Sequence, residues 1–286
     1  MASIARARMT AVAFIAAAAA ILISLLIAFI WAFQERIAFQ PPGGPWPDAG
    51  AARVDYTAQD GQRLFAYVVG DRSAPSGLLL SFHGNADLAV WQIDWAEEIN
   101  RRSGVTVMLA EYRGYMGLGG QPAYAGSRLD ADAAYLYARD SLRIPATHIA
   151  LFGHSLGTAV AAELAARHRP AALLLQSPFT SARDMAGRMT GYTPADFLWR
   201  LISRIHFNTV ARVGELDAPV SVVHGGNDRL IPVKMGEEVF ASAKVKGAWL
   251  LVPGAAHNDV ELVGGDAYWG WLISALMVLP EAQRNP

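Results

Sequence analysis

The sequence predicts an α/β protein in which a mostly parallel sheet is covered by helices on both faces, preceded by one membrane-spanning helix. From about residue 77 onward, continuously apolar runs alternate with segments of helical periodicity. Strands that are apolar on both sides occur in sheets that are buried on both faces. Residues 9–33 carry no charged side chain, and as a helix this stretch of about 37 Å exceeds a hydrocarbon core of about 30 Å.

The N-terminal apolar segment favours a retained membrane anchor over a cleaved signal peptide. A signal peptide has a shorter apolar stretch followed by a small-x-small cleavage site, and no Ala-x-Ala follows Ile30. Arg6 and Arg8 precede the segment, whereas Glu35 and Arg36 follow it and nearly cancel. The positive-inside rule therefore predicts a cytoplasmic N-terminus and an extracytoplasmic domain, periplasmic or lumenal.

Three parts follow along the chain. Residues 1–36 form the cytoplasmic stub and anchor, residues 37–50 a linker rich in Pro and Gly, and residues 51–286 one large domain. Apolar runs predict strands over 53–57, 64–69, 77–84, 105–114, 147–152, 171–178, 219–225 and 247–253, the first two as a hairpin turning at Asp60-Gly61. Helical patterns cover 88–102, 129–142, 156–168, 237–243 and 268–280.

The alternation of strands and helices breaks between Pro178 and Leu216. This stretch contains aromatic and arginine residues without a strand pattern, which predicts a small helical lid over about 180–214. Lids of this kind commonly exclude water from active sites and shape specificity. A plain helical connection is the alternative.

Composition excludes several classes of function. The net charge of −1 and the absence of an arginine- or lysine-rich stripe argue against nucleic acid as a partner. Without cysteine there is no disulfide, thiol nucleophile or cysteine-ligated metal. No His-Glu-x-x-His pattern occurs among the seven histidines, so we expect neither a metal site nor a cofactor. Composition leaves the oligomeric state open.

The stretch LFGHSLGTAV, residues 151–160, places Ser155 between Gly153 and Gly157. The pattern G-x-S-x-G is a turn between strand and helix so sharp that the serine is strained and its hydroxyl stands exposed. An apolar strand pattern precedes it and an Ala-rich helical pattern follows it, as that turn requires. The alternative is a glycine-flanked serine in an ordinary strand-to-helix turn.

A serine hydroxyl needs a histidine to accept its proton and a carboxylate to orient that histidine. Asp228 and His257 each follow a predicted strand, at the carboxyl edge where ligands bind open α/β sheets. Asp217 is a rival acid, but it precedes its strand and so lies at the wrong end. The sequence therefore predicts Ser155, Asp228 and His257 as the catalytic residues, in the chain order serine, acid, histidine.

An oxyanion formed on a substrate carbonyl needs two preorganised N–H donors. One is the amide of the residue after the nucleophile, Leu156. The other should follow the strand that ends at His83-Gly84, which makes the amide of Asn85 the best candidate and that of Ala86 its rival.

Three further histidines receive structural interpretations. His154 should point away from the nucleophile and pack structurally. His83 and His224 end predicted strands, and we interpret both as supports. His257 alone stands where a base is required.

The ordered motifs resemble those of the α/β-hydrolase superfamily, and more narrowly of its membrane-anchored Bem46-like branch. They are SFHGNAD (81–87), EYRGYMGLGGQP (111–122), GHSLGTAVA (153–161), SPFTS (177–181), HGGNDRLIP (224–232) and PGAAHND (253–259). The resemblance runs from about Ala38 to the C-terminus and implies the α/β-hydrolase fold, an N-terminal anchor and a Ser155, Asp228, His257 triad. Glu111 stands where the family usually has aspartate, and Asp87 where asparagine is common.

These observations predict a membrane-anchored serine hydrolase that cleaves ester or thioester bonds of acylated, lipid-like substrates through an acyl-enzyme, without a cofactor. Relatives in the family cleave esters, thioesters or lysophospholipids, so the resemblance leaves the substrate open. Two alternatives remain: a serine peptidase on the same fold, and a catalytically silent membrane-anchored binding protein.

Overall fold

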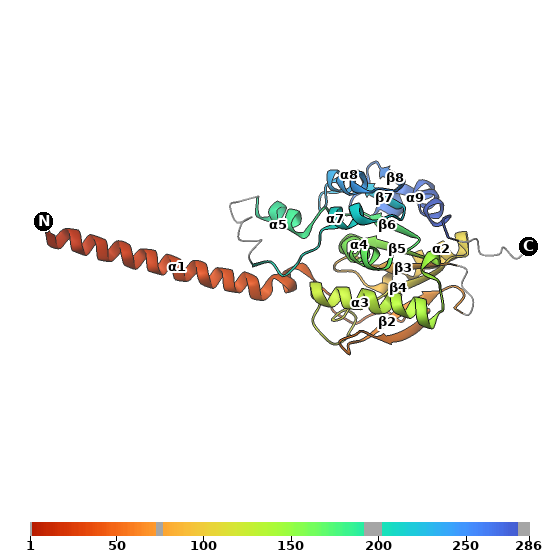
Figure 1. Ribbon diagram of the computed structural model, residues 1–286, viewed down its shortest axis with the longest axis horizontal. Helices are drawn as coiled ribbons and strands as arrows, with labels where there is room; N and C mark the ends of the chain where they lie inside the picture. The colour runs from red at the N-terminus through yellow and green to blue at the C-terminus, as the bar shows by residue number, and fades with distance from the viewer. Residues whose placement is uncertain (1, 73–76, 192–201, 280–286) are drawn as a thin grey trace, which may run out of the picture.

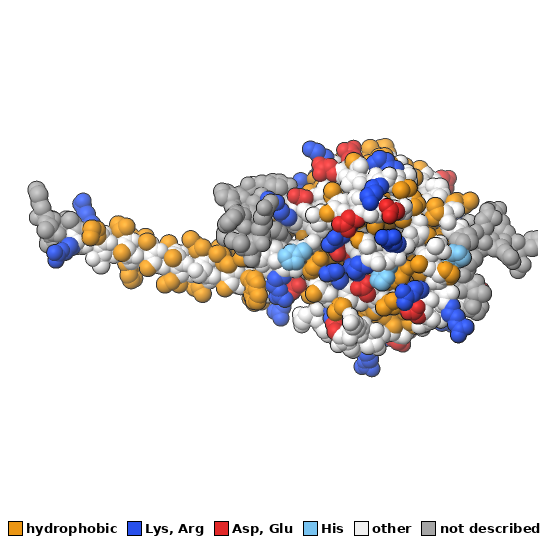
Figure 2. Space-filling view, viewed as in Figure 1, with side chains coloured by type: hydrophobic (Ala, Val, Ile, Leu, Met, Phe, Trp, Pro, Cys, Tyr) orange, Lys and Arg blue, Asp and Glu red, His pale blue; other side chains and the backbone are white. Residues whose placement is uncertain are grey.

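A computed structural model describes residues 2–72, 77–191 and 202–279 of the chain. The first helix, α1 (Ala2–Ala38), leaves the globular domain as one long rod (Figure 1). Hydrophobic side chains cover most of its visible surface, whereas acidic and basic side chains are mixed over the domain (Figure 2). Among the described residues this helix alone is long and apolar enough to cross a membrane, a test that a signal sequence also passes.

The domain is built on an eight-stranded sheet in the order β1-β2-β4-β3-β5-β6-β7-β8. Its strands are β1 (Ala52–Thr57), β2 (Arg63–Val69), β3 (Leu78–Phe82), β4 (Thr106–Ala110), β5 (Ile149–His154), β6 (Ala172–Gln176), β7 (Val220–Gly225) and β8 (Lys246–Val252). β2 is antiparallel to β1 and to β4, and every other pairing is parallel. The prediction of a mostly parallel sheet is confirmed.

Helices pack against the sheet in two groups. α3 (Tyr124–Leu136), α4 (Leu156–His168), α7 (Thr209–Glu215) and α8 (Val233–Ser242) contact one another in series, and α2 (Ile93–Ser103) contacts α9 (Val260–Leu276). Strands β3, β4, β6 and β7 are buried along their full length, and β5 is buried as far as Gly153, which explains their predominantly apolar sequence. The predicted helices on both faces are thereby confirmed.

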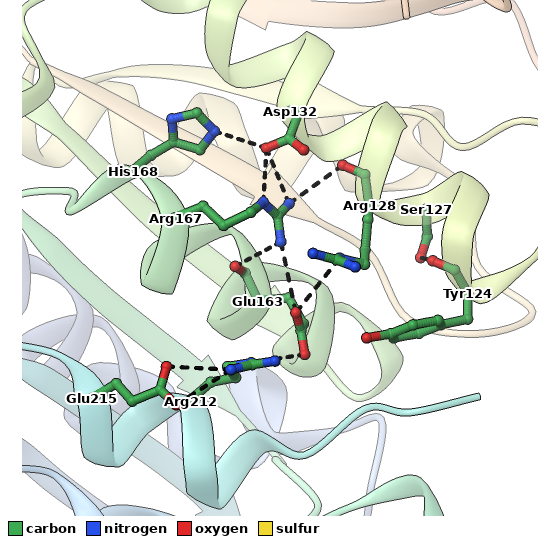
Figure 3. Close-up of polar contacts among 9 residues, drawn as sticks. All are labelled: Tyr124, Ser127, Arg128, Asp132, Glu163, Arg167, His168, Arg212 and Glu215. Carbon is green, nitrogen blue, oxygen red and sulfur yellow. Dashed lines mark hydrogen bonds and ion pairs between the residues drawn. The ribbon is translucent and has the colours of Figure 1, made fainter. Parts of the chain in front are cut away.

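A buried carboxylate joins α3, α4 and α7 (Figure 3). Glu163 of α4, 3% exposed at its side chain, accepts a hydrogen bond from Arg212 Nε of α7 at 3.0 Å, and Arg128 Nε of α3 and Arg167 Nη1 of α4 each lie 3.6 Å from it. Arg212 also pairs with Glu215, and Arg167 with Asp132. Three arginines therefore compensate one carboxylate that burial would otherwise penalise.

Three helices begin earlier than the sequence pattern predicts, and one of them is α3, which begins at Tyr124 instead of 129. α9 begins at Val260 instead of 268, because its first half contains Gly264 and Gly265, which break the apolar pattern. Gly265 has φ +49° and ψ −128°, so the helix is kinked there. A Cβ on Gly264 would come within 2.9 Å of the Tyr268 side chain, so the glycine permits close packing. α8 begins at Val233, directly after Pro232.

The predicted lid region contains two helices with different surroundings. α5 (Ala182–Thr190) borders a cavity, whereas α7 packs on α4 in the body of the domain. Residues 192–201 lie outside the described residues. Within the part of the chain that the structure describes, α5 is the segment of the predicted lid that borders the cavity.

Candidate active site

Ser155 occupies a strained turn between β5 and α4. Its φ of +52° and ψ of −115° lie outside the regions that side-chain-bearing residues usually adopt. A Cβ on Gly157 would overlap the Phe82 carbonyl oxygen, and a Cβ on Gly153 would overlap the backbone of Gly157. Both positions therefore require glycine, because α4 starts in direct contact with β3 and with the end of β5.

The structure brings the three side chains predicted from sequence into one hydrogen-bonded chain. His257 Nε2 lies 2.9 Å from Ser155 Oγ, and His257 Nδ1 lies 2.7 Å from Asp228 Oδ2. Asp228 follows β7 and His257 follows β8, so all three residues meet at the carboxyl edge of the parallel strands. The rival acid Asp217 is exposed instead and lies 3.5 Å from Lys244 Nζ.

Asp228 is held in its charged form by several donors. The amides of Leu230 and Ile231 donate to Oδ1 at 2.9 and 2.8 Å, and His224 Nε2 lies 3.4 Å from Oδ2. Burial alone would raise the pKa of Asp228, but the contacts with His224, His257 and the Ile231 amide lower that pKa well below its ordinary value. The carboxylate can therefore stabilise positive charge on His257.

Two main-chain amides predicted as oxyanion donors border the same cavity as Ser155. They belong to Leu156, the first residue of α4, and Asn85, in the loop after β3. Neither N–H donates to a protein acceptor in the described part of the chain. Ala86, the rival donor, also borders the cavity and has a left-handed backbone with φ +54°.

Behind this loop lies a buried pair, His83 and Glu111, each 1% exposed. His83 Nε2 is 2.7 Å from Glu111 Oε1, and His83 Nδ1 is 2.8 Å from the Gly84 carbonyl oxygen. Both neighbours accept hydrogen bonds, so the geometry fits a doubly protonated imidazole. Burial would lower the pKa of His83, but the Glu111 charge and hydrogen bond raise it overall.

His154 lies differently from its predicted position. Its ring borders the cavity, with its centroid 5.3 Å from that of His257 and its Nε2 3.4 Å from the His257 carbonyl oxygen. Space for the ring exists because Gly84 has no side chain: a Cβ there would come within 3.1 Å of His154 Nδ1. The other two supports are confirmed in place, since His224 also donates to the Ile231 carbonyl oxygen at 2.9 Å and His83 backs the loop of Asn85.

Ser155 opens into a cavity of about 880 Å³. Its walls are mainly apolar, with Trp91, Trp95, Phe152, Phe179, Met185 and Phe207 among them. This volume falls in the range of small-molecule and lipid-chain sites, about 300–1,000 Å³. No group of three or more His, Asp or Glu side chains in the described ranges converges as a metal site.

Sequence reasoning missed one wall of this cavity. Ile30, Gln34 and Ile37 of α1 line it, together with Phe39 and Gln40 just beyond the helix. The signal in the sequence is that Ile37 repeats the helical face of Ile30 and Gln34 beyond the charged residues Glu35 and Arg36. We interpreted residues 9–33 as a membrane span and residues 37–50 as a linker.

The Asn85 side chain fastens this segment to the oxyanion loop. Its Nδ2 donates to the Ala38 carbonyl oxygen at 2.8 Å, and its Oδ1 accepts from the Gln40 amide at 2.7 Å and from the Tyr115 hydroxyl at 3.0 Å. The end of α1 and the loop after β3 are therefore one hydrogen-bonded unit.

The chain is similar in sequence to one family model and to several known proteins. A family model described as "Serine aminopeptidase, S33" matches residues 73–207. An uncharacterised protein of Mycobacterium tuberculosis is 35% identical over 257 residues, covering 88% of this chain and 90% of that protein. The human protein named alpha/beta hydrolase domain-containing protein 17B is 30% identical over 190 residues, covering 65% of this chain and 62% of that protein. The chain belongs to the α/β-hydrolase superfamily.

Solved α/β hydrolases share the fold of this hydrolase at low sequence identity. An esterase of Pyrococcus furiosus superposes with a TM-score of 0.67 at 18% identity, covering 85% of this chain and 98% of its own. A monoacylglycerol lipase of Paleococcus ferrophilus superposes with a TM-score of 0.56 at 17% identity, covering 74% of this chain and 98% of its own. Both likenesses concern the fold.

Proposed function

We propose that this α/β hydrolase is a membrane-anchored serine hydrolase of the Bem46-like branch, which cleaves carboxylic ester or thioester bonds of acylated, lipid-like substrates. The observation that carries the proposal is the chain Ser155–His257–Asp228 opening into a large apolar cavity. The named activities of the structural neighbours, an esterase and a monoacylglycerol lipase, agree with ester chemistry.

The mechanism follows from the geometry. Ser155 Oγ attacks the acyl carbon while its proton passes to His257 Nε2, and Asp228 stabilises the resulting imidazolium. The amides of Leu156 and Asn85 bind the carbonyl oxygen as it becomes an oxyanion. The tetrahedral intermediate collapses, His257 protonates the leaving alcohol or thiol, and an acyl-enzyme remains. Water, deprotonated by His257, then releases the acid.

The location of the protein is part of the proposal. α1 would act as a single-pass anchor with a cytoplasmic N-terminus, because Arg6 and Arg8 precede the apolar run. The catalytic domain would then lie on the extracytoplasmic side. Its substrate is a small molecule or a lipid carrying an acyl group.

The activity is tested by labelling the full-length protein with a fluorophosphonate probe. We expect labelling of the wild type and none of Ser155→Ala, and hydrolysis of p-nitrophenyl acyl esters by the wild type only. A wild-type protein that neither labels nor hydrolyses any ester would refute the proposal and favour a silent binding protein.

A peptidase is a second candidate, because the matched family model is described as an aminopeptidase and an acidic side chain, Glu261, borders the cavity. A carboxylate there could pair with the amino terminus of a peptide. Comparing peptide p-nitroanilides with p-nitrophenyl esters decides between the two. We expect esters to be cleaved faster, and faster amide turnover would overturn the assignment.

A further inference from the structure

The anchor helix contributes a wall to the cavity instead of only tethering the domain. Ile30, Gln34 and Ile37 line the cavity, and their spacing of four and three residues places them on one face of α1. Ile30 belongs to the uncharged run 9–33. The cavity that begins at Ser155 therefore reaches side chains that lie within the depth of a bilayer.

Hydrogen bonds fix this wall against the domain. Gln34 is 5% exposed, and its amide donates to the Ile202 carbonyl oxygen at 2.9 Å and accepts from the Arg204 amide at 2.7 Å. Glu35 accepts from the Tyr124 amide at the first turn of α3 and pairs with Arg204 Nη2 at 3.1 Å. Because Gln34 uses its polar atoms on the domain, the wall offers apolar surface to the cavity.

The rim of the cavity is apolar and exposed. Ile37 is 51% exposed, Trp91 52%, Leu230 57% and Met189 76%, and all four line the cavity. Met189 belongs to α5, which lies beside the domain end of α1 (Figure 1). Exposed apolar side chains of this kind, continuous with a membrane-spanning helix, are stable at the surface of a bilayer.

The charges of the cavity restrict the substrate. Within the described ranges its lining contains two carboxylates, Asp87 and Glu261, and no lysine or arginine. A phosphate or free carboxylate on the substrate would find no lysine or arginine partner there and would be repelled by Glu261. A neutral head group avoids both the repulsion by Glu261 and the burial of an unpaired charge.

We propose that the cavity opens laterally into the bilayer along the Ile30, Gln34, Ile37 face of α1, and that the substrate is an uncharged acyl ester or thioester amphiphile taken from the membrane. The proposal rests on the proposed hydrolase function and on membrane insertion of α1. The acyl chain would pass from the lipid phase along Ile30 and Ile37 to Ser155 without crossing water.

The first test uses the full-length protein in phosphatidylcholine vesicles that contain 1-monooleoylglycerol. Inert phosphatidylcholine is added while the bulk concentration of monooleoylglycerol is held constant. We expect the rate to fall in proportion to the mole fraction of substrate in the bilayer. A rate that follows bulk concentration would overturn lateral uptake. Replacing the substrate by oleoyl lysophosphatidate, which carries a phosphate, should lower turnover at least about tenfold, and equal turnover would overturn the charge argument.

The second test compares two substitutions at the same depth of α1. Ile30→Trp places a larger side chain in the wall and so narrows the cavity. Phe29→Trp alters a side chain that is 56% exposed and does not line the cavity. Tryptophan is well tolerated at membrane interfaces. We expect Ile30→Trp to lower the ratio of monooleoylglycerol to p-nitrophenyl acetate turnover by about tenfold, and Phe29→Trp to leave it unchanged. Equal ratios in both variants would overturn the proposal.

The two proposals fail in different ways. If the wild type shows neither fluorophosphonate labelling nor p-nitrophenyl acetate hydrolysis, the hydrolase function fails. If that activity is present and is lost in Ser155→Ala, yet dilution and the Ile30 substitution have no selective effect, only lateral uptake fails.

Discussion

Glu111 contacts His83, which in turn contacts the peptide group between Gly84 and Asn85, the proposed oxyanion donor. His83 Nδ1 contacts the Gly84 carbonyl oxygen, and the N–H at the other end of that peptide bond is the amide of Asn85. In a trans peptide the carbonyl and the N–H point in opposite directions, so the bond from His83 both aims and polarises the Asn85 donor. The Glu111 charge and hydrogen bond raise the pKa of His83, which favours the protonated ring that can donate to both acceptors.

We therefore expect Glu111→Gln to lower kcat by about tenfold to a hundredfold with little change in KM, because the loss is confined to oxyanion stabilisation. Steady-state kinetics on a p-nitrophenyl ester give both constants. Glu111→Asp, which restores the charge, should recover part of the activity. A purely structural role would lower the folded fraction, and a Glu111→Gln protein with unchanged kcat would contradict this assignment.

His154 couples stability to pH. Burial and the nearby His257 lower the pKa of His154 from 6.5 to about 4. The unfolded chain therefore binds a proton at His154 between these values while the folded protein does not, so stability is lost as pH falls from 6.5 towards 4. Linkage bounds this loss at about 3 kcal/mol, and partial exposure of the ring reduces it.

The measurement is thermal or urea unfolding at several pH values. His154→Gln should show a shallower decline in the free energy of unfolding between pH 6.5 and pH 4 than the wild type. Identical slopes in the two proteins would show that the His154 ring is not kept neutral by folding.

At the residue scale, sequence located Ser155, Asp228 and His257 because each stands directly after a predicted strand, where the fold gathers its loops. The pairing of His83 with Glu111 joins the ends of β3 and β4, and no spacing rule in the sequence encodes it. The prediction that His154 points away from the nucleophile was wrong, because the space for its ring depends on the absence of a Cβ at Gly84.

At the element scale, the ion pairs around Glu163 hold α4 between α3 and α7 (Figure 3). Glu163→Gln removes the carboxylate that Arg128, Arg167 and Arg212 share. We expect a loss of about 2 kcal/mol in the free energy of unfolding, below that for a fully buried pair, because the three arginines that lose their shared partner are 24–41% exposed at their side chains.

Glu215→Gln is the matched control, since Glu215 also pairs with Arg212 but is 55% exposed at its side chain. It should cost less than about 1 kcal/mol. Urea unfolding of both variants gives the comparison. Equal losses of unfolding free energy in the two variants would show that the buried Glu163 stabilises the protein no more than the exposed Glu215.

Strands were easier to predict than helix starts. Burial on both faces makes β3 to β7 predominantly apolar, and that signal survives in a single sequence. The start of α9 was hidden by two glycines: Gly264, which allows close packing of Tyr268, and Gly265, which has φ +49° at the kink. Local propensity thus pointed away from a helix that tertiary packing stabilises.

At the scale of the whole molecule, the orientation of α1 decides where the reaction occurs. The positive-inside rule applied to Arg6 and Arg8 gives the proposed cytoplasmic N-terminus, and with that topology a reporter fused after residue 286 should be accessible from outside the cytoplasm. Protease digestion of intact cells or spheroplasts, compared with lysed ones, measures this. A reporter protected in intact spheroplasts would reverse the topology.

The fold class and the long apolar helix could both be predicted, since each follows from patterns within a few dozen neighbouring residues. The contact of α1 with the domain could not be predicted, because Gln34 donates a hydrogen bond to Ile202, which lies 168 positions further along the chain. A contact of that range leaves no periodic trace in the sequence.

Asn85 Nδ2 donates to the Ala38 carbonyl oxygen, and the Gln40 amide donates to Asn85 Oδ1, so with α1 inserted in a bilayer we expect catalysis to respond to membrane thickness. A helix longer than the local hydrocarbon layer tilts to fit it. Tilt of α1 would shift Ala38 and Gln40 and thereby displace the loop that carries the Asn85 amide. We expect ester turnover to change across vesicles made from lipids of increasing chain length, and Asn85→Ala to flatten that profile. Unchanged turnover across the series would mean that the anchor moves independently of the loop.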